Sequence, residues 1–301
     1  MGLRQLARLL RVSLLPSALA DGLAGLVVGS RGELPEARLL LWLPASAALY
    51  HGGMALNDWA DRHHDAATRP DRPIPSGAVP ASLALALGLG LLALGALLGA
   101  LAHPLLGWGG LVLAGLVAAY DLVGRGPLLG PLLLGSCRSL NFGLPLLMAS
   151  AALPPPPGAV LLAASYGAWV ALVSTFARAE DGEAALIPQR QQHLLLACAA
   201  LLPVPALTAG VVLQEPLGGA LGALLAASAA AGPLSAWRSQ EPWTRARVEA
   251  TVGLLLRRLL VVTASVTLVT CPLGRAGLPA ALLILSGYPL ARQLRRIAPP
   301  S

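Results

Sequence analysis

Three aspartates are clustered at the end of an apolar segment, where charge is costly. Asp58, Asp61 and Asp65 follow a hydrophobic run that begins at Leu39. If this run continues as a helix, the i, i+3, i+7 spacing places the three carboxylates in one narrow stripe. Like charges repel one another, so a positive group must lie among them. We predict that this group is Mg²⁺, because Mg²⁺ binds one or two carboxylates together with waters and phosphate oxygens.

Polar residues follow two further apolar segments. Tyr120 and Asp121 end one of them, and Arg125 lies just beyond. The Arg125 guanidinium could reach back toward a phosphate, or it could serve only as an anchor at the lipid headgroups. Glu180 and Glu183 follow the later segment as an i, i+3 carboxylate pair. If the loops meet, this pair could form a second metal site opposite the aspartates.

Ionisable and amide side chains also occur inside apolar segments. Arg138 and Asn141 lie one turn apart on one helical face, and Asp21 lies in the first apolar segment. Such residues need partners within the bundle or in a water-filled cavity. Arg138 therefore either points into a cavity as an anion ligand or carboxylate partner, or forms a structural ion pair.

The composition of the chain indicates whether it folds in water or in a membrane. Of the 301 residues, 56% are hydrophobic and only 12% are charged, and the mean hydropathy is +0.70, far from the values of soluble domains. Apolar runs of about 20 residues are long enough to cross a bilayer as helices and too long for buried strands. They cover residues 12–29, 38–57, 80–102, 104–122, 130–151, 158–177, 193–213, 217–236, 250–271 and 277–293. We predict an all-α polytopic membrane protein, a single domain over residues 1–301 with nine or ten helices around a central cavity.

Arginines are concentrated in alternate loops. They precede the first apolar segment and follow the second, fourth, sixth, eighth and last. The positive-inside rule then places both termini and these loops in the cytoplasm, with the protein in the inner membrane, and this alternation requires ten segments. Arg257 and Arg258 lie in the middle of the ninth segment. They must face a polar cavity, unless that segment is re-entrant or interfacial.

The net charge of +7 does not indicate a nucleic-acid partner. The arginines are dispersed over loops, as membrane topology alone requires. The three cysteines stand singly in apolar segments, so the sequence contains no CxxC metal motif. Nothing in the sequence specifies an oligomeric state.

A family resemblance covers the aspartate stripe and the basic segment that follows it. Asn57-Asp58-x-x-Asp61-x-x-x-Asp65, continuing into Arg69-Pro70-x-Arg72-Pro73-Ile74-Pro75-Ser76-Gly77, resembles the first signature of the UbiA superfamily of intramembrane prenyltransferases. Tyr120-Asp121 and the number of helices extend the resemblance over most of the chain. It implies an all-helical bundle around a cavity open laterally to lipid. Two acidic motifs on facing loops would hold Mg²⁺ against a polyprenyl diphosphate.

The resemblance also implies roles for individual residues. Asn57, Asp58, Asp61 and Asp65 would form the first metal motif, with the three aspartates catalytic, and Glu180 and Glu183 would be the other metal ligands. Substrate would be bound by Asn57, Arg69, Arg72, Tyr120, Arg125, Arg138, Asn141 and Arg178. The usual paired aspartates of the second motif are replaced by Arg178-x-Glu180-Asp181-x-Glu183. This replacement resembles the divergent EboC-like branch, as do Asp21-Gly22-x-x-Gly25 and Cys137-Arg138-x-Leu140-Asn141.

The implied reaction is transfer of a prenyl group from a polyprenyl diphosphate to a lipophilic or aromatic acceptor. Mg²⁺ and arginines would stabilise the charge that develops on the departing diphosphate. An apolar cavity would keep water away from the carbocation. Two alternatives are a transferase of the same fold with a phosphoribosyl diphosphate donor, and a non-catalytic carrier of lipids or metabolites. The intact first motif favours catalysis, whereas the altered second motif favours the carrier.

The arginine pattern predicts a cytoplasmic C-terminus. A reporter fused after Arg296 should give a cytoplasmic signal, because an even number of crossings returns the chain to the side on which it began. Paired alkaline phosphatase and green fluorescent protein fusions measure this, with fusions after Arg31 as the control for the opposite side. A periplasmic signal at Arg296 would show that the number of crossings is odd.

Overall fold

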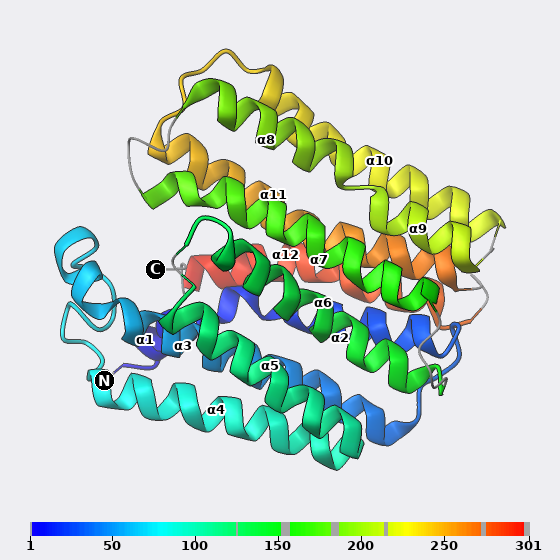
Figure 1. The fold of residues 1–301 in the computed structure, drawn as a ribbon, viewed down its shortest axis with the longest axis horizontal. Helices are drawn as coiled ribbons and strands as arrows, with labels where there is room; N and C mark the ends of the chain where they lie inside the picture. The colour runs from blue at the N-terminus through cyan, green and yellow to red at the C-terminus, as the bar shows by residue number, and fades with distance from the viewer. Residues whose placement is uncertain are drawn as a thin grey trace.

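The computed structural model describes residues 2–124, 126–151, 157–181, 187–213, 216–271 and 275–297. They form an all-helical bundle in which the long helices run side by side (Figure 1). The α-helices, with short 3-10 helices labelled η, are α1 (Leu3–Leu9), η1 (Val12–Leu14), α2 (Leu15–Gly29), η2 (Ala37–Leu41), α3 (Trp42–Thr68), α4 (Ala81–Ala102), α5 (Pro104–Leu122), α6 (Leu129–Ala149), α7 (Pro157–Ala177), η3 (Arg178–Asp181), α8 (Pro188–Leu201), α9 (Val204–Leu213), α10 (Pro216–Arg238), α11 (Arg245–Thr270) and α12 (Gly277–Ile297).

Proline determines where several helices begin and where α3 ends. Four helices, α5, α7, α8 and α10, begin at a proline, whose missing N–H costs nothing in the first turn. α3 ends at Thr68, and the next residue, Arg69, precedes Pro70 and leaves the helical conformation. The chain then turns, with the Arg72 amide donating to the Arg69 carbonyl. This turn brings two arginines back toward the end of α3.

Nine helical segments in the described part of the chain are long and apolar enough to cross a bilayer. One of them is α11, a continuous helix that contains Arg257 and Arg258. A continuous helix of 26 residues is not re-entrant. α12, the predicted tenth segment, is also a helix of 21 residues, although it is not one of the nine.

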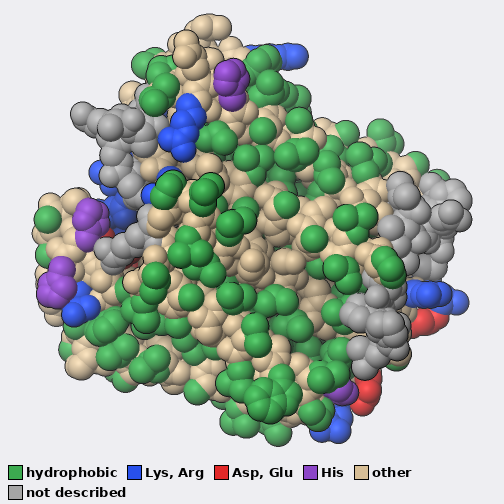
Figure 2. Space-filling view, viewed as in Figure 1, with side chains coloured by type: hydrophobic (Ala, Val, Ile, Leu, Met, Phe, Trp, Pro, Cys, Tyr) green, Lys and Arg blue, Asp and Glu red, His purple; other side chains and the backbone are tan. Residues whose placement is uncertain are grey.

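The surface of the bundle is apolar over its middle. In Figure 2, hydrophobic side chains cover the centre of the visible face, and charged side chains gather toward the helix ends. Several large side chains of α4 and α5 are more than half exposed, including Leu89, Leu97, Leu111 and Val112. Water would disfavour such a surface, whereas lipid chains match it. The protein is therefore a multi-pass membrane protein.

Both chain ends lie toward one end of the bundle (Figure 1). The segments that follow α3, α5 and α7 lie at this same end. The three polar insertions that the sequence places on one side of the membrane thus meet in space. The candidate site residues of these insertions therefore lie at this end of the bundle.

Glycines allow the helices to approach one another closely. A Cβ atom added at Gly135 of α6 would lie 2.5 Å from the carbonyl oxygen of Gly167 in α7, and one added at Gly167 would lie 2.7 Å from the carbonyl oxygen of Gly135. Lipid is as apolar as leucine, so close packing is a main source of helix association in a bilayer. This contact fixes α6, the helix that carries Arg138 and Asn141.

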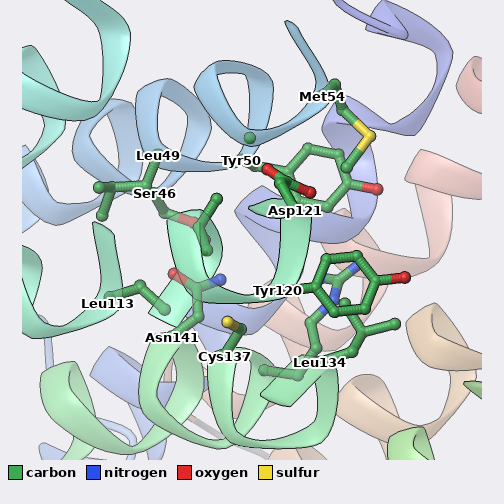
Figure 3. A pocket seen from close by; sticks show the side chains of 13 residues that line it. Ser46, Leu49, Tyr50, Met54, Leu113, Tyr120, Asp121, Leu134, Cys137 and Asn141 are labelled. Carbon is green, nitrogen blue, oxygen red and sulfur yellow. The ribbon is translucent and has the colours of Figure 1, made fainter. Parts of the chain in front are cut away.

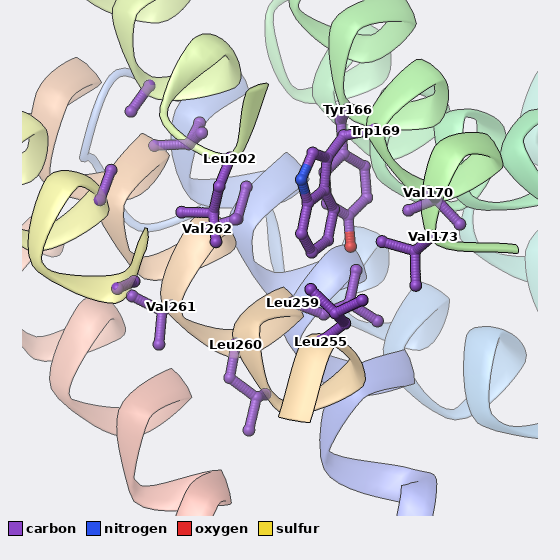
Figure 4. Close-up of a cluster of buried hydrophobic side chains, with 14 of the residues drawn as sticks. Tyr166, Trp169, Val170, Val173, Leu202, Leu255, Leu259, Leu260, Val261 and Val262 are labelled. Atoms are coloured by element: carbon purple, nitrogen blue, oxygen red, sulfur yellow. The ribbon is translucent and has the colours of Figure 1, made fainter. Parts of the chain in front are cut away.

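A second stabilising feature is a large buried cluster that joins α7 to α11 (Figure 4). Tyr166 and Trp169 of α7 are fully buried against leucines of α11 such as Leu255 and Leu259. The Trp169 indole N–H donates to the Cys198 carbonyl of α8 at 3.0 Å, so its polar atom is satisfied. The cluster holds the second half of the bundle against the helices that carry the site.

The contact between Gly135 and Gly167 gives a stability prediction. Gly135→Ala should lower the melting temperature in detergent, because the added methyl group collides with backbone that cannot move aside independently. Gly90→Ala in α4 is the matched control, since nothing lies within 4 Å of a Cβ atom there. It should leave the melting temperature unchanged or raise it, because alanine favours helix by about 0.8–1.0 kcal/mol over glycine. Equal melting temperatures for the two variants would contradict the proposed packing role.

Candidate active site

A polar cavity of about 250 Å³ lies where the three insertions meet. Its lining comes from the residue before η1, from α3, α5, α6 and α7, and from the segments that follow α3, α5 and α7. These residues are Arg11, Asn57, Asp61, Arg69, Arg72, Tyr120, Gly124, Gly130, Pro131, Ser174, Ala177 and Arg178. The structure therefore brings together predicted site residues from three widely separated parts of the sequence.

Two of the three aspartates in the stripe are buried and paired with arginine. Arg72 donates to Asp65 at 2.7 Å and lies 3.8 Å from Asp58, while Arg11 donates to Asp58 at 2.9 Å. The side chains of Asp58 and Asp65 are 2% and 1% exposed. Asp61, by contrast, lines the polar cavity. The positive charge that the stripe requires is thus supplied by the protein itself.

Arg11 is a site residue that the sequence analysis treated only as a topology signal. It takes a left-handed conformation with φ of +48° between α1 and η1, which is uncommon for a non-glycine residue. Burial lowers the pKa of its guanidinium, but Asp58, together with Tyr50 and Tyr120, more than offsets this effect, so the pKa is raised above its ordinary value. Arg11 and Asp58 are 47 positions apart, and no local spacing connects them.

The carboxylates retain unused oxygen atoms that fit a hard cation. Asp58 Oδ2 and Asp65 Oδ1 are buried without a hydrogen-bond partner. Across the described residues, no three His, Cys, Asp or Glu side chains converge closely enough to hold a metal ion by themselves. Mg²⁺ does not need three, because phosphate oxygens and waters complete its coordination. The donor set therefore fits Mg²⁺ that arrives with a phosphorylated substrate.

A second, mostly apolar cavity of about 70 Å³ lies next to the polar one and shares Tyr120 with it (Figure 3). Its lining comprises Ser46, Leu49, Tyr50, Gly53, Met54, Leu113, Val117, Tyr120, Asp121, Leu134, Cys137, Arg138 and Asn141. Asp121 is buried and forms a side-chain hydrogen bond with Asn57, which lines the polar cavity. Its Oδ2 atom has no hydrogen-bond partner. The Tyr120-Asp121 motif marked this position, but the sequence analysis gave Asp121 no role.

Arg138 forms a buried ion pair with Asp21. Arg138 Nη1 donates to Asp21 Oδ2 at 2.7 Å, and Nη2 donates to the Ser17 hydroxyl at 3.1 Å. The Tyr166 hydroxyl donates to Asp21 Oδ1 at 2.6 Å, and the Asn141 amide donates to Asp21 Oδ2 at 3.4 Å. The carboxylate partner that the sequence analysis considered is therefore Asp21. Because Arg138 also lines the apolar cavity, contact with an anionic substrate remains a prediction.

The structure does not describe the side chains of three of the predicted site residues. Arg125, Glu183 and the side chain of Glu180 lie outside the described residues. Arg178 belongs to η3 and lines the polar cavity, so the start of the second motif does reach the site.

The fold and the site define an all-helical membrane protein with a polar, arginine-rich cavity beside an apolar one. The comparison with known proteins gives the family. The model of the UbiA prenyltransferase family matches residues 18–255, and the chain belongs to this family. The reaction of the family is prenyl transfer from a polyprenyl diphosphate, and the acceptor of this chain is not determined.

Named relatives match only part of the chain. Digeranylgeranylglyceryl phosphate synthase from Ignicoccus hospitalis is 51% identical over 63 residues, which cover 21% of this chain and 21% of the relative. The bacteriochlorophyll synthase 33 kDa chain from Cereibacter sphaeroides is 42% identical over 67 residues, or 22% of this chain and 21% of the relative. The matched segment thus spans about a fifth of each relative. These names do not include an EboC-like protein, so the comparisons support the superfamily rather than that branch.

The fold is similar to solved structures over nearly their whole length. A UbiA homologue from Archaeoglobus fulgidus, bound to GPP and Mg²⁺, superimposes with a TM-score of 0.63 and 15% sequence identity. The match covers 86% of this chain and 99% of the homologue. At this level of identity the likeness establishes the fold alone.

The pairing of Arg138 with Asp21 gives a prediction that separates structure from substrate binding. Arg138→Gln should strongly destabilise the protein, by about 3–5 kcal/mol, because it leaves Asp21 buried and unpaired. Asp21→Asn combined with Arg138→Gln should restore much of that loss. Thermal melts of the single and double variants measure the coupling.

Turnover of the double variant then decides the role of Arg138. A stable double variant with normal turnover would leave Arg138 as an internal counter-ion, and a stable but inactive one would support contact with substrate.

Proposed function

We propose that this protein transfers a prenyl group from a polyprenyl diphosphate to a lipophilic or aromatic acceptor, with Mg²⁺, at the cytoplasmic face of the inner membrane. The observation that carries the proposal is the pair of adjoining cavities. The polar cavity is lined by four arginines (Arg11, Arg69, Arg72 and Arg178), and the apolar cavity meets it at Tyr120. A prenyl diphosphate has the same division between a highly charged end and an apolar chain.

The arginines of the polar cavity would bind the diphosphate. Guanidinium groups match phosphate oxygens through paired N–H donors and stay charged at any cellular pH. Arg69, Arg72 and Arg178 come from two different loops, so they could surround the anion from two sides. Arg125, outside the described residues, is proposed as a further ligand from the third loop.

Asn57, Asp58, Asp61 and Asp65 are the proposed Mg²⁺ ligands, together with Glu180 and Glu183 of the second motif. When bound, Mg²⁺ would stabilise the negative charge that develops on the departing diphosphate. Asp61 already lines the cavity. Asp58 and Asp65 each retain one oxygen without a partner, which supports their assignment as ligands.

The apolar cavity would hold the first part of the prenyl chain and exclude water. Ionisation of the allylic diphosphate leaves a carbocation that water would capture. Tyr120 belongs to the linings of both cavities, which supports a place for it beside the reacting carbon. Asp121 lines the apolar cavity with a free oxygen, and we propose that it accepts the proton of the acceptor nucleophile.

The EboC-like branch remains part of the proposal. It rests on Asp21, Arg138 and Asn141, which form one buried network, and on the altered second motif. The two named relatives are named for different products, so they do not select one acceptor.

Asp61 gives the direct test of this function. Asp61→Ala should reduce Mg²⁺-dependent release of diphosphate from geranyl diphosphate by about a hundredfold or more, because the variant removes a proposed metal ligand next to the leaving group. Asp71→Ala is the matched control: Asp71 is exposed, outside the cavity lining, and paired with Arg8 at 3.7 Å. It should retain activity within about twofold.

Product identity requires lipid mass spectrometry of membranes that contain the intact protein or the Asp61→Ala variant. A prenylated lipid present only with the intact protein would support the proposal. Unchanged diphosphate release by Asp61→Ala would remove Asp61 from the site. Binding of geranyl diphosphate without any release would favour the carrier instead.

A further inference from the structure

A cavity of about 300 Å³ lies between α11 and α12, separate from the polar cavity of the candidate active site. It is lined by Arg257 of α11 and by Tyr288, Ala291, Arg292 and Arg295 of α12. Three of the five lining residues are arginines, and none is acidic. The proposed prenyl transfer gives this cavity no role.

Arg11 and Arg72 of the polar cavity are paired with aspartates, and the described carboxylates offer no such pairing to the three arginines of this cavity. Within the described residues, no carboxylate forms an ion pair with Arg257, Arg292 or Arg295. The Nε atom of Arg295 is buried and has no hydrogen-bond partner. Arg257 and Arg295 are half-buried, whereas Arg292 is exposed. Half-buried charge of one sign is costly unless an opposite charge is bound. An anion bound from outside the protein would offset this excess of positive charge.

Two of the guanidinium groups lie beside Gly253. A Cβ atom added at Gly253 of α11 would lie 3.5 Å from Arg257 Nη1 and 3.8 Å from Arg295 Nη1. The two like charges are thus held near one another, and both side chains line the cavity. A single anion in the cavity could accept from both groups at once.

The surroundings of the cavity indicate an amphipathic ligand. A smaller cavity of about 30 Å³ shares Arg257, Ala291 and Arg295 with it. Its lining also includes apolar side chains of η1, α2 and α11, namely Leu14, Pro16, Leu256, Leu259 and Leu260. It reaches Tyr50 and Arg138, which also line the apolar cavity of the active site. A ligand held here would place its charged group among the arginines and its apolar part beside these apolar side chains.

We propose that Arg257, Arg292 and Arg295 bind the phosphate monoester headgroup of a lipid. A phosphate monoester carries about −1.5 to −2 charges near neutral pH and offers three acceptor oxygens, which suits three guanidinium groups and the Tyr288 hydroxyl. A carboxylate would offset only one of the three charges. No residue of the polar cavity takes part, so this proposal does not depend on the prenyl-transfer mechanism.

The test measures lipid binding to the purified full chain in phosphatidylcholine nanodiscs without Mg²⁺. The probes are short-chain phosphatidic acid, diacylglycerol of the same chain length, and inorganic phosphate. Arg295→Gln should weaken phosphatidic acid binding about tenfold or more, as expected for loss of charge-assisted hydrogen bonds. Arg296→Gln is the matched control, because Arg296 is the next residue of α12, is exposed and does not line the cavity. It should change binding by less than about twofold.

Gly253→Leu tests the arrangement of the arginines without changing their charge, because the added side chain would displace the Arg257 and Arg295 guanidinium groups that lie beside Gly253. It should also weaken phosphatidic acid binding. Equal effects of Arg295→Gln and Arg296→Gln would overturn the proposal in favour of general attraction between a basic helix end and anionic lipid. Equal affinity for inorganic phosphate and phosphatidic acid would support the anion site and overturn the lipid assignment. Binding of diacylglycerol as tightly as phosphatidic acid would overturn the phosphate assignment.

Discussion

The cost of placing charge inside a membrane bundle governs this structure. Asp21 is completely buried in α2, and its two oxygens accept from Arg138 of α6, Tyr166 of α7 and Asn141 of α6. The indole N–H of Trp42, at the start of α3, donates to the Asn141 carbonyl at 3.1 Å. The carboxylate thus links three helices, α2, α6 and α7, and Asn141 also links α6 to the start of α3. In a low dielectric these bonds strengthen one another, and the loss of one partner leaves an expensive unpaired charge.

The same constraint shapes the active site. Asp58 and Asp65 lie near the end of α3, and Arg11 and Arg72 neutralise them in the protein alone. A diphosphate that binds Arg72 competes with both carboxylates for one guanidinium, so a cation that enters with the diphosphate would compensate the acids. The ion pairs with Arg11 and Arg72 hold the Asp58 and Asp65 side chains in their buried positions. Asp61, which faces the cavity, is the aspartate that substrate would meet first.

The sequence predicted the features that depend on local pattern and missed those that depend on long-range pairing. Hydropathy located most of the helices, although the predicted segment 193–213 is divided into α8 and α9 and the short α1 was not predicted. The positions of the polar insertions predicted that distant loops meet. The spacing of the aspartates correctly predicted that a positive group lies among them. In the protein without ligands, Arg11 and Arg72 supply that charge. Arg138 and Asp21 are 117 positions apart, and only tertiary packing selects one acid from those available. The sequence marked Asp121 as part of the Tyr120-Asp121 motif but did not place it in the site, because its hydrogen bond to Asn57 links two different helices.

The central ion pair also divides the interior into compartments. Arg138 and Tyr50 line both the apolar cavity of the active site and the small cavity beside α11 and α12. The Arg138 guanidinium lies over the Tyr50 ring at 5.0 Å, so the two side chains form one wall. A charged residue held by a buried carboxylate makes a firm wall, because any movement breaks several hydrogen bonds at once. The pair that stabilises the bundle therefore also sets the boundary of the cavity that we propose for the prenyl chain.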